Sequence, residues 1–228
     1  MKKIYIKPAL ELVDIGESYI MAASEKLATN DAHDSTFSNR TYIEKLTQNI
    51  VLEKLQMVIA IEDVEIYSDS TLCNDLRFDD LDMVNFVMSL EKTLNIIIED
   101  SFCLNSDDTM NKQLTVQSVI DYCADKVEKA MARSYSYINK LTQTIVIETL
   151  QILTGIEEDD EIRPDNNLCN DLGLDELDMM ELVMSLEKTL DISIEDSFYA
   201  NSDDTIKKQL SVQSLINYCT GKVRKCSE

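Results

Sequence analysis

Apolar and acidic residues recur with helical spacing in two segments of this chain that nearly copy each other. In the second copy, the apolar positions Leu177, Met180, Met184 and Leu190 follow one another at spacings of three, four and six. These spacings predict one apolar stripe on an amphipathic helix, and such a stripe is typical of a face turned towards a core. The opposite face of the predicted helix carries Asp178, Glu181 and Glu187.

The start of each predicted helix has the spacing of a capping box. Asp175 precedes the second copy and Asp178 follows three residues later, so both carboxylates are placed to accept free backbone N–H groups of the first turn. Asp79 and Asp82 repeat the arrangement in the first copy. We therefore expect the two acidic helices to begin beside Asp79 and Asp175.

The chain repeats itself from Tyr42 onward. Residues 42–48 return as residues 137–143, and an ungapped comparison of residues 72–123 with 168–219 gives 37 identities in 52 positions. Self-similarity of this kind indicates the duplication of one structural unit.

Each repeat is predicted to contain four helices. In the first repeat these are a helix over about residues 42–58, the acidic helix, a short third helix at capping residues 105–109, and a fourth starting at Thr115. In the second repeat the corresponding positions are residues 137–154, 201–205 and Ser211.

These helices predict an all-α fold with two tandem four-helix bundles, at residues 42–130 and 137–226. Residues 1–41 are expected to form a flexible N-terminal extension or a leader. Because only residues 131–136 join the two bundles, we expect the bundles to sit close together.

The composition limits the kinds of partner. The formal net charge is −22, from 43 acidic and 21 basic residues, which argues against nucleic acid and anionic membranes and suits basic protein surfaces. No apolar run approaches the roughly 20 residues that span a bilayer. The six cysteines are expected to be reduced and to pack as small apolar residues.

Candidate catalytic chemistry is sparse. The single histidine, His33, lies in the polar N-terminal region, and neither a Gly-rich phosphate loop nor a nucleophile elbow is present. The acidic pairs lack the fixed spacing of a calcium-binding loop. We therefore predict no catalytic residue and no specific metal site.

The two acidic segments resemble the signature of acyl carrier proteins, in which Asp-Ser-Leu-Asp begins an apolar and acidic helix that ends in Leu-Glu. Residues 114–122 also resemble the family's fourth helix, with its Thr-Val-Gln and Ile-Asp-Tyr. The resemblance implies a carrier fold in each repeat and a phosphopantetheine arm on the serine. It also implies docking of the second helix onto basic patches of partner enzymes.

The attachment serine is replaced in both repeats, by Asp80 and by Glu176. A carboxylate at this position would form an acyl phosphate, which hydrolyses readily, so we expect no phosphopantetheine cofactor. One interpretation of the two acids is structural, because a carboxylate in a helix's first turn interacts favourably with the helix dipole, worth roughly 0.3–1 kcal/mol. The other is functional: the acid imitates the phosphate that partner enzymes expect.

The resemblance implies partner docking through Asp79, Asp82, Glu91, Asp175, Asp178, Glu181 and Glu187. Our preferred hypothesis is a non-catalytic, cytoplasmic binding module that docks onto carrier-recognising enzymes without an arm. One alternative is a working acyl carrier in fatty-acid or polyketide-type biosynthesis. Another is an exported product, because residues 1–8 and 21–24 resemble the leaders of some bacterial peptide natural-product precursors.

Overall fold

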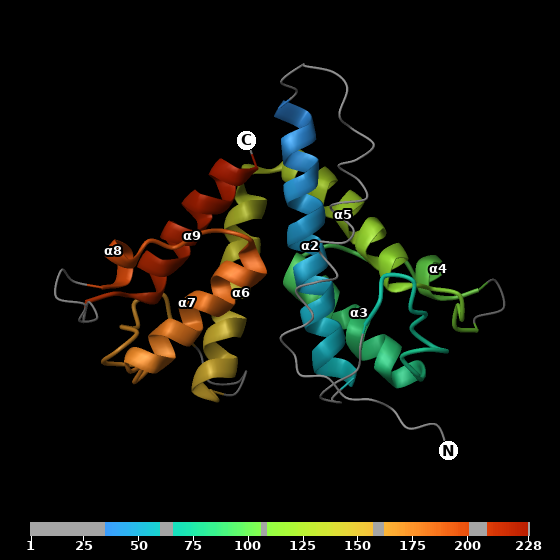
Figure 1. The fold of residues 1–228 in the computed structure, drawn as a ribbon, viewed down its shortest axis with the longest axis horizontal. Coiled ribbons are helices and arrows are strands. Elements are labelled where there is room, and N and C mark those ends of the chain that lie inside the picture. Colours follow the sequence, from blue (N-terminus) through green and yellow to red (C-terminus); the bar gives the residue numbers. More distant parts are fainter. Residues whose placement is uncertain (1–34, 60–65, 106–108, 157–161, 201–208, 228) are drawn as a thin grey trace.

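The computed structural model describes residues 35–59, 66–105, 109–156, 162–200 and 209–227. Within these ranges the chain is helical, and its only β-type pairings are isolated bridges. The helices form two tandem domains (Figure 1), which confirms the predicted all-α fold. The proposed leader, at residues 1–8 and 21–24, lies outside the described residues.

Among the residues that the structure describes, each domain has three longer helices and one single-turn helix. The first domain contains α2 (Ser35–Ile59), α3 (Asp80–Leu94), α4 (Asp100–Cys103) and α5 (Val116–Arg133). The second contains α6 (Tyr135–Thr154), α7 (Glu176–Leu190), α8 (Asp196–Tyr199) and α9 (Val212–Cys226). In both domains the second and last helices pack against the first, so α3 and α5 cover α2, and α7 and α9 cover α6.

One predicted boundary differs from the structure. Helix α2 begins at Ser35, inside the range assigned to the N-terminal extension. A single-turn helix lies at Asp100–Cys103, before the segment in which the short third helix was predicted. The prediction at residues 105–109 includes residues 106–108, which lie outside the described residues. The matching prediction at residues 201–205 lies outside the described residues.

The last helix of each domain begins where the sequence predicts. The hydroxyl oxygen of Thr115 accepts the backbone N–H of Ser118, and Ser211 accepts that of Ser214 in the same way. These hydroxyls satisfy donors that a helix N-terminus otherwise leaves free.

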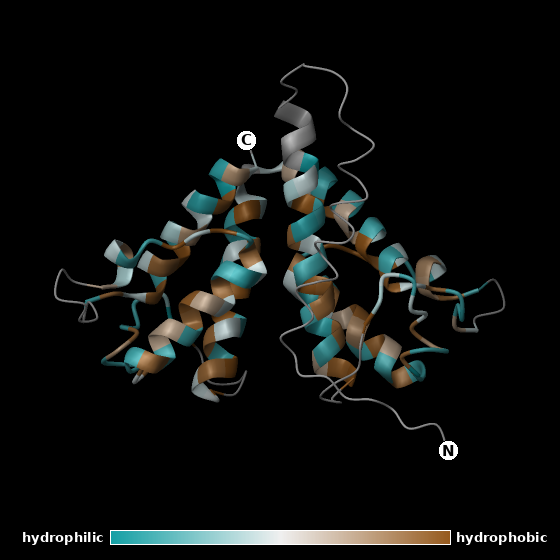
Figure 2. Cartoon of the chain, in the orientation of Figure 1, coloured by the Kyte–Doolittle hydropathy of each residue, from teal (hydrophilic) through white to brown (hydrophobic). Residues whose placement is uncertain are grey.

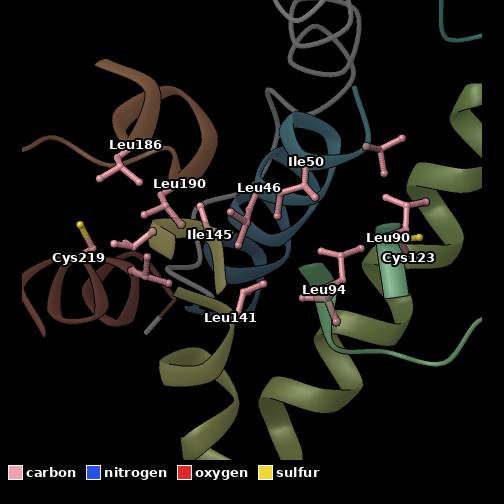
Figure 3. Packing of buried hydrophobic residues seen from close by; sticks show 14 of the residues in the cluster. Leu46, Ile50, Leu90, Leu94, Cys123, Leu141, Ile145, Leu186, Leu190 and Cys219 are labelled. Carbon is pink, nitrogen blue, oxygen red and sulfur yellow. The ribbon is translucent and has the colours of Figure 1, made fainter. Parts of the chain in front are cut away.

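Cysteines contribute to both cores as apolar side chains. Cys123 packs near Leu90 and Leu94, and its counterpart Cys219 occupies the same place in the second domain (Figure 3). Burial raises the pKa of both thiols to about 12. The thiols therefore stay protonated at neutral pH and behave as small hydrophobic groups.

The single-turn helices are fastened to the last helices by the same contacts in both domains. The ring of Phe198 stacks on Tyr218 with centroids 3.9 Å apart, as Phe102 stacks on Tyr122. Lys222 pairs with Glu195, and this hydrogen bond lowers the pKa of the Glu195 carboxyl. These contacts hold α8 and α4 against the outer surface of each bundle.

The two domains lie directly against each other. Only Ser134 separates α5 from α6. Figure 1 shows α2 and α6 at the centre, with the other helices of each domain on opposite outer sides. Helix α2 contacts α7 of the second domain, and α6 contacts α3 of the first. The expected close association of the domains is confirmed.

The loop before each acidic helix requires a left-handed residue, and the two repeats supply it differently. Gly173 has φ +74°, whereas its counterpart Arg77 has φ +62°. A residue with a Cβ costs roughly 1–2 kcal/mol in this conformation, and glycine avoids most of that cost.

We predict that Arg77→Gly stabilises the first domain by about 0.5–1 kcal/mol, because relief of strain exceeds the added entropy of the unfolded chain. Gly173→Ala should destabilise the second domain by about 1 kcal/mol. Chemical denaturation of the full chain measures both changes. A destabilising Arg77→Gly would show that the arginine side chain makes a compensating interaction.

Candidate functional site: the outer faces of α3 and α7

Reciprocal hydrogen bonds fix the starts of α3 and α7. In the second domain Asp175 Oδ1 accepts the backbone N–H groups of Leu177 and Asp178 at 2.8 and 3.0 Å. Asp178 Oδ2 in turn accepts the N–H of Asp175 at 3.0 Å. Asp79 and Asp82 form the same capping box in the first domain. The predicted caps are confirmed, and each of these four carboxylates has one oxygen engaged in its own helix.

The attachment position comes directly after each cap. Asp80 and Glu176 are the first residues of α3 and α7, and both side chains are exposed. At this position a carboxylate lies in the favourable field of the helix N-terminus. Its exposure also leaves the charge accessible to another protein, so the geometry agrees with both interpretations of these acids.

The predicted inward stripe of α7 is wrong. Leu177, Met180 and Met184 point to solvent, with exposed fractions of 73%, 50% and 65%, and only Leu190 is buried. The core-facing apolar residues are a different set, Met179, Leu182, Val183, Leu186 and Leu190. Both sets of residues have helical spacing. The larger set packs against α6 because its burial removes more apolar area from water.

The first domain exposes the same apolar positions. Leu81, Val84 and Met88 on α3 have exposed fractions of 67%, 52% and 62%. We call these three residues, and Leu177, Met180 and Met184 on α7, the outer stripes. Two equivalent stripes on the surface of one chain are unusual for positions that only face water.

The predicted docking acids fall into two groups. Glu181 is exposed and lies within one helical turn of Leu177 and Met184, so it borders the outer stripe. Glu187 and Glu91 lie near the other end of their helices, where each accepts a backbone N–H of the following loop, from Ile194 and Ile98 respectively, at 2.7 Å. These two acids therefore have a structural task that sequence reasoning missed.

The charged and apolar groups form one surface on each domain. Each outer face presents an acid at the attachment position, a capping carboxylate and three apolar side chains along a single helix. The second domain adds Glu181, where the first has Asn85. Such a surface suits protein binding, because it combines apolar area for affinity with charges for orientation.

In the described part of the chain, no cluster of three or more histidine, cysteine or acidic side chains is arranged to hold a metal ion. None of the described helices is both long and apolar enough to cross a membrane.

Comparison with known proteins identifies the class of the second domain. Residues 144–210 match the family model described as "Phosphopantetheine attachment site". The match lies within the second domain and covers less than half of the chain, and it confirms the resemblance to acyl carrier proteins. The sequence of the first domain repeats that of the second with 37 identities in 52 positions, so the chain is a tandem of acyl-carrier-like domains.

A solved structure is also similar to this chain. It is described as "Solution structure of the apo doublet acyl carrier protein from prodigiosin biosynthesis". The sequences are 17% identical, the alignment covers 86% of this chain and 87% of that one, and the TM-score is 0.28.

The geometry predicts different consequences for two adjacent acids. Asp175→Ala should cost about 1 kcal/mol of stability, because two backbone N–H groups lose their acceptor. Glu176→Gln should change stability by no more than about 1 kcal/mol, the value of a favourable charge at the helix dipole. Urea unfolding of the full chain measures both. A larger cost for Glu176→Gln than for Asp175→Ala would mean that Glu176 has a structural role beyond the dipole.

Proposed function

We propose that the protein is a non-catalytic pair of carrier-like domains that docks onto carrier-recognising enzymes without a covalent arm. The observation that carries the proposal is the outer stripe of α7, which stays exposed beside an attachment position that has no hydroxyl. The outer stripe could bind a partner, whereas Glu176 beside it is unsuited to the attachment of phosphopantetheine.

The residues at the attachment position do not fit phosphopantetheine. A stable phosphodiester forms when a hydroxyl attacks phosphorus, and Asp80 and Glu176 offer only carboxylates. Ser89 and Ser185 lie on the same helices, but about two and a half turns away, and both are partly buried. A partner that positions its phosphopantetheine donor at the helix start would not reach these serines.

The outer stripes support docking because their apolar surface would contribute binding free energy when a partner covers it. Apolar surface removed from water contributes about 25 cal/mol per Å², and exposed methionines adapt to varied partner shapes. The acids along the same faces would favour a partner with basic residues around an apolar groove. The net charge of −22 would further accelerate encounter with such a partner.

A working carrier is the second candidate, and the match of residues 144–210 to a phosphopantetheine-attachment family favours it. It requires some other residue to accept the arm. The two candidates therefore differ in whether the unaltered chain is modified by a phosphopantetheinyl transferase.

We predict that Glu176→Ser converts the second domain into a substrate. With coenzyme A and a phosphopantetheinyl transferase, the variant should gain the mass of one arm, because only the nucleophile is missing from its surface. Glu176→Ala is the matched control and should stay unmodified. Modification of the unaltered chain would support the working carrier, and an unmodified Glu176→Ser would contradict retained recognition.

We also predict that the outer stripe and its acid determine affinity for the same transferase. Met184→Ser and Glu181→Lys should each weaken binding about tenfold, the first through lost apolar contact and the second through charge repulsion. Isothermal titration calorimetry measures the affinity. Asp121→Lys, an equal charge change on α5, is the control and should bind as the unaltered chain does. Equal weakening by Glu181→Lys and Asp121→Lys, with Met184→Ser binding as the unaltered chain does, would show that net charge alone governs binding.

A further inference from the structure

Several contacts between the two domains come in equivalent pairs. The hydroxyl of Tyr42 donates to the Leu190 carbonyl at 2.7 Å, and the hydroxyl of its counterpart Tyr137 donates to the carbonyl of Leu94. At the rim, Lys45 pairs with Asp191, and Lys140 donates to Asn95. Each domain therefore uses the same surface to contact the other, as the subunits of a two-fold symmetric dimer do.

A self-complementary surface raises the question of which copies pair. The first domain can pair with the second within one chain, which is the arrangement in the structure. A second copy of the chain offers another arrangement, in which like domains pair between chains. The short connection between the domains already favours pairing within one chain, and a residue that makes the unlike pair more stable than the like pairs adds to that preference.

Two side chains break the symmetry. Asn49 donates to the Lys188 carbonyl at 2.7 Å, whereas its counterpart Thr144 donates within its own helix, and Lys54 places one buried cation in the interface. Lys54 is only 2% exposed, and its Nζ lies 2.8 Å from Glu148 Oε2 of the second domain and 3.5 Å from Glu53 Oε1. Glu53 and Glu148 are counterparts in the two repeats. The counterpart of Lys54, however, is Thr149, whose hydroxyl donates to the Ile145 carbonyl of its own helix.

The hydroxyls around the two carboxylates remain symmetric. Thr189 on α7 donates to Glu53 Oε2 at 2.9 Å, and Thr93 on α3 donates to Glu148 Oε2 at 2.9 Å. One ammonium group and two hydroxyls thus contact two carboxylates, which belong to different domains. Loss of the ammonium would leave both carboxylates facing each other across the interface with neutral partners only.

We infer that Lys54 is the residue that selects the pairing of unlike domains within one chain. Two second domains from separate chains would bring two copies of Glu148 together with no lysine, which is unfavourable for partly buried charges. Two first domains would need room for a second lysine where the interface holds a threonine. Every chain carries one first domain and one second domain. When two first domains pair with each other, the second domains are left to pair without a lysine.

The selection has a structural consequence for the outer faces. Thr93 and Thr189 sit in the last turns of α3 and α7, so the Lys54 cluster ties the end of each acidic helix to the other domain. The two outer stripes are thereby held at one relative orientation. This inference does not depend on docking, because it concerns how the domains hold each other and not what their outer faces bind.

The test uses the full chain and its Lys54→Met variant, which keeps a similar volume and removes the charge. Hydrogen exchange by mass spectrometry reports protection at the last turns of α3 and α7, and light scattering reports the molar mass. We expect those turns to exchange about tenfold faster or more in the variant, and its molar mass to rise above that of a monomer, while α9 keeps its protection. Unchanged exchange at unchanged mass would overturn the inference.

A relocated lysine separates a specific role from a general loss of folding. In Lys54→Thr/Thr149→Lys the cation moves to the equivalent position of the other repeat, and the pseudo-two-fold interface should accept it. We expect this double variant to regain the protection and monomeric mass that Lys54→Met loses. A double variant as open or as unfolded as Lys54→Met would overturn the inference, whatever the single variant does to the core.

Discussion

The packing of α7 against α6, and of α3 against α2, determines what the protein can present to a partner. Figure 2 shows hydrophobic residues interspersed with hydrophilic ones along both acidic helices. The apolar residues of each helix include a buried set and an exposed set, and only one of the two sets can enter the core. Burial of the five-residue face of α7 places Met180 and Met184 outside. The same burial fixes Glu176 at the exposed helix start, so recognition surface and attachment position follow from a single packing choice.

Features that depend on neighbouring residues were predictable from the sequence. The capping boxes at Asp79 and Asp175 require only a carboxylate at the right spacing, and the start of α9 at Ser211 requires only a hydroxyl before an apolar run. The duplication was equally visible, because equivalent residues recur at a nearly constant shift. These features use information within a few turns of chain, or a comparison of the chain with itself.

Features that depend on tertiary contacts were not predictable. Leu177 and Leu182 both fit the apolar pattern of a helix. Only the position of α6 decides that Leu182 is buried and Leu177 is exposed. Glu187 looked like a docking acid, yet the Ile194 N–H occupies one of its oxygens. The Lys54 cluster left no local signal, because Glu53 and Glu148 lie 95 residues apart and meet only when the domains pair.

The two surfaces divide the work of the chain. The inner surface joins the domains through paired tyrosine and threonine hydrogen bonds around a single lysine, and the outer stripes are exposed. The central proposal is that these outer faces bind carrier-recognising enzymes although the chain carries no phosphopantetheine arm. Intact-mass spectrometry of the protein from its native producer tests this most directly. The proposal predicts a mass without phosphopantetheine, and a mass gain equal to one arm or two would contradict it.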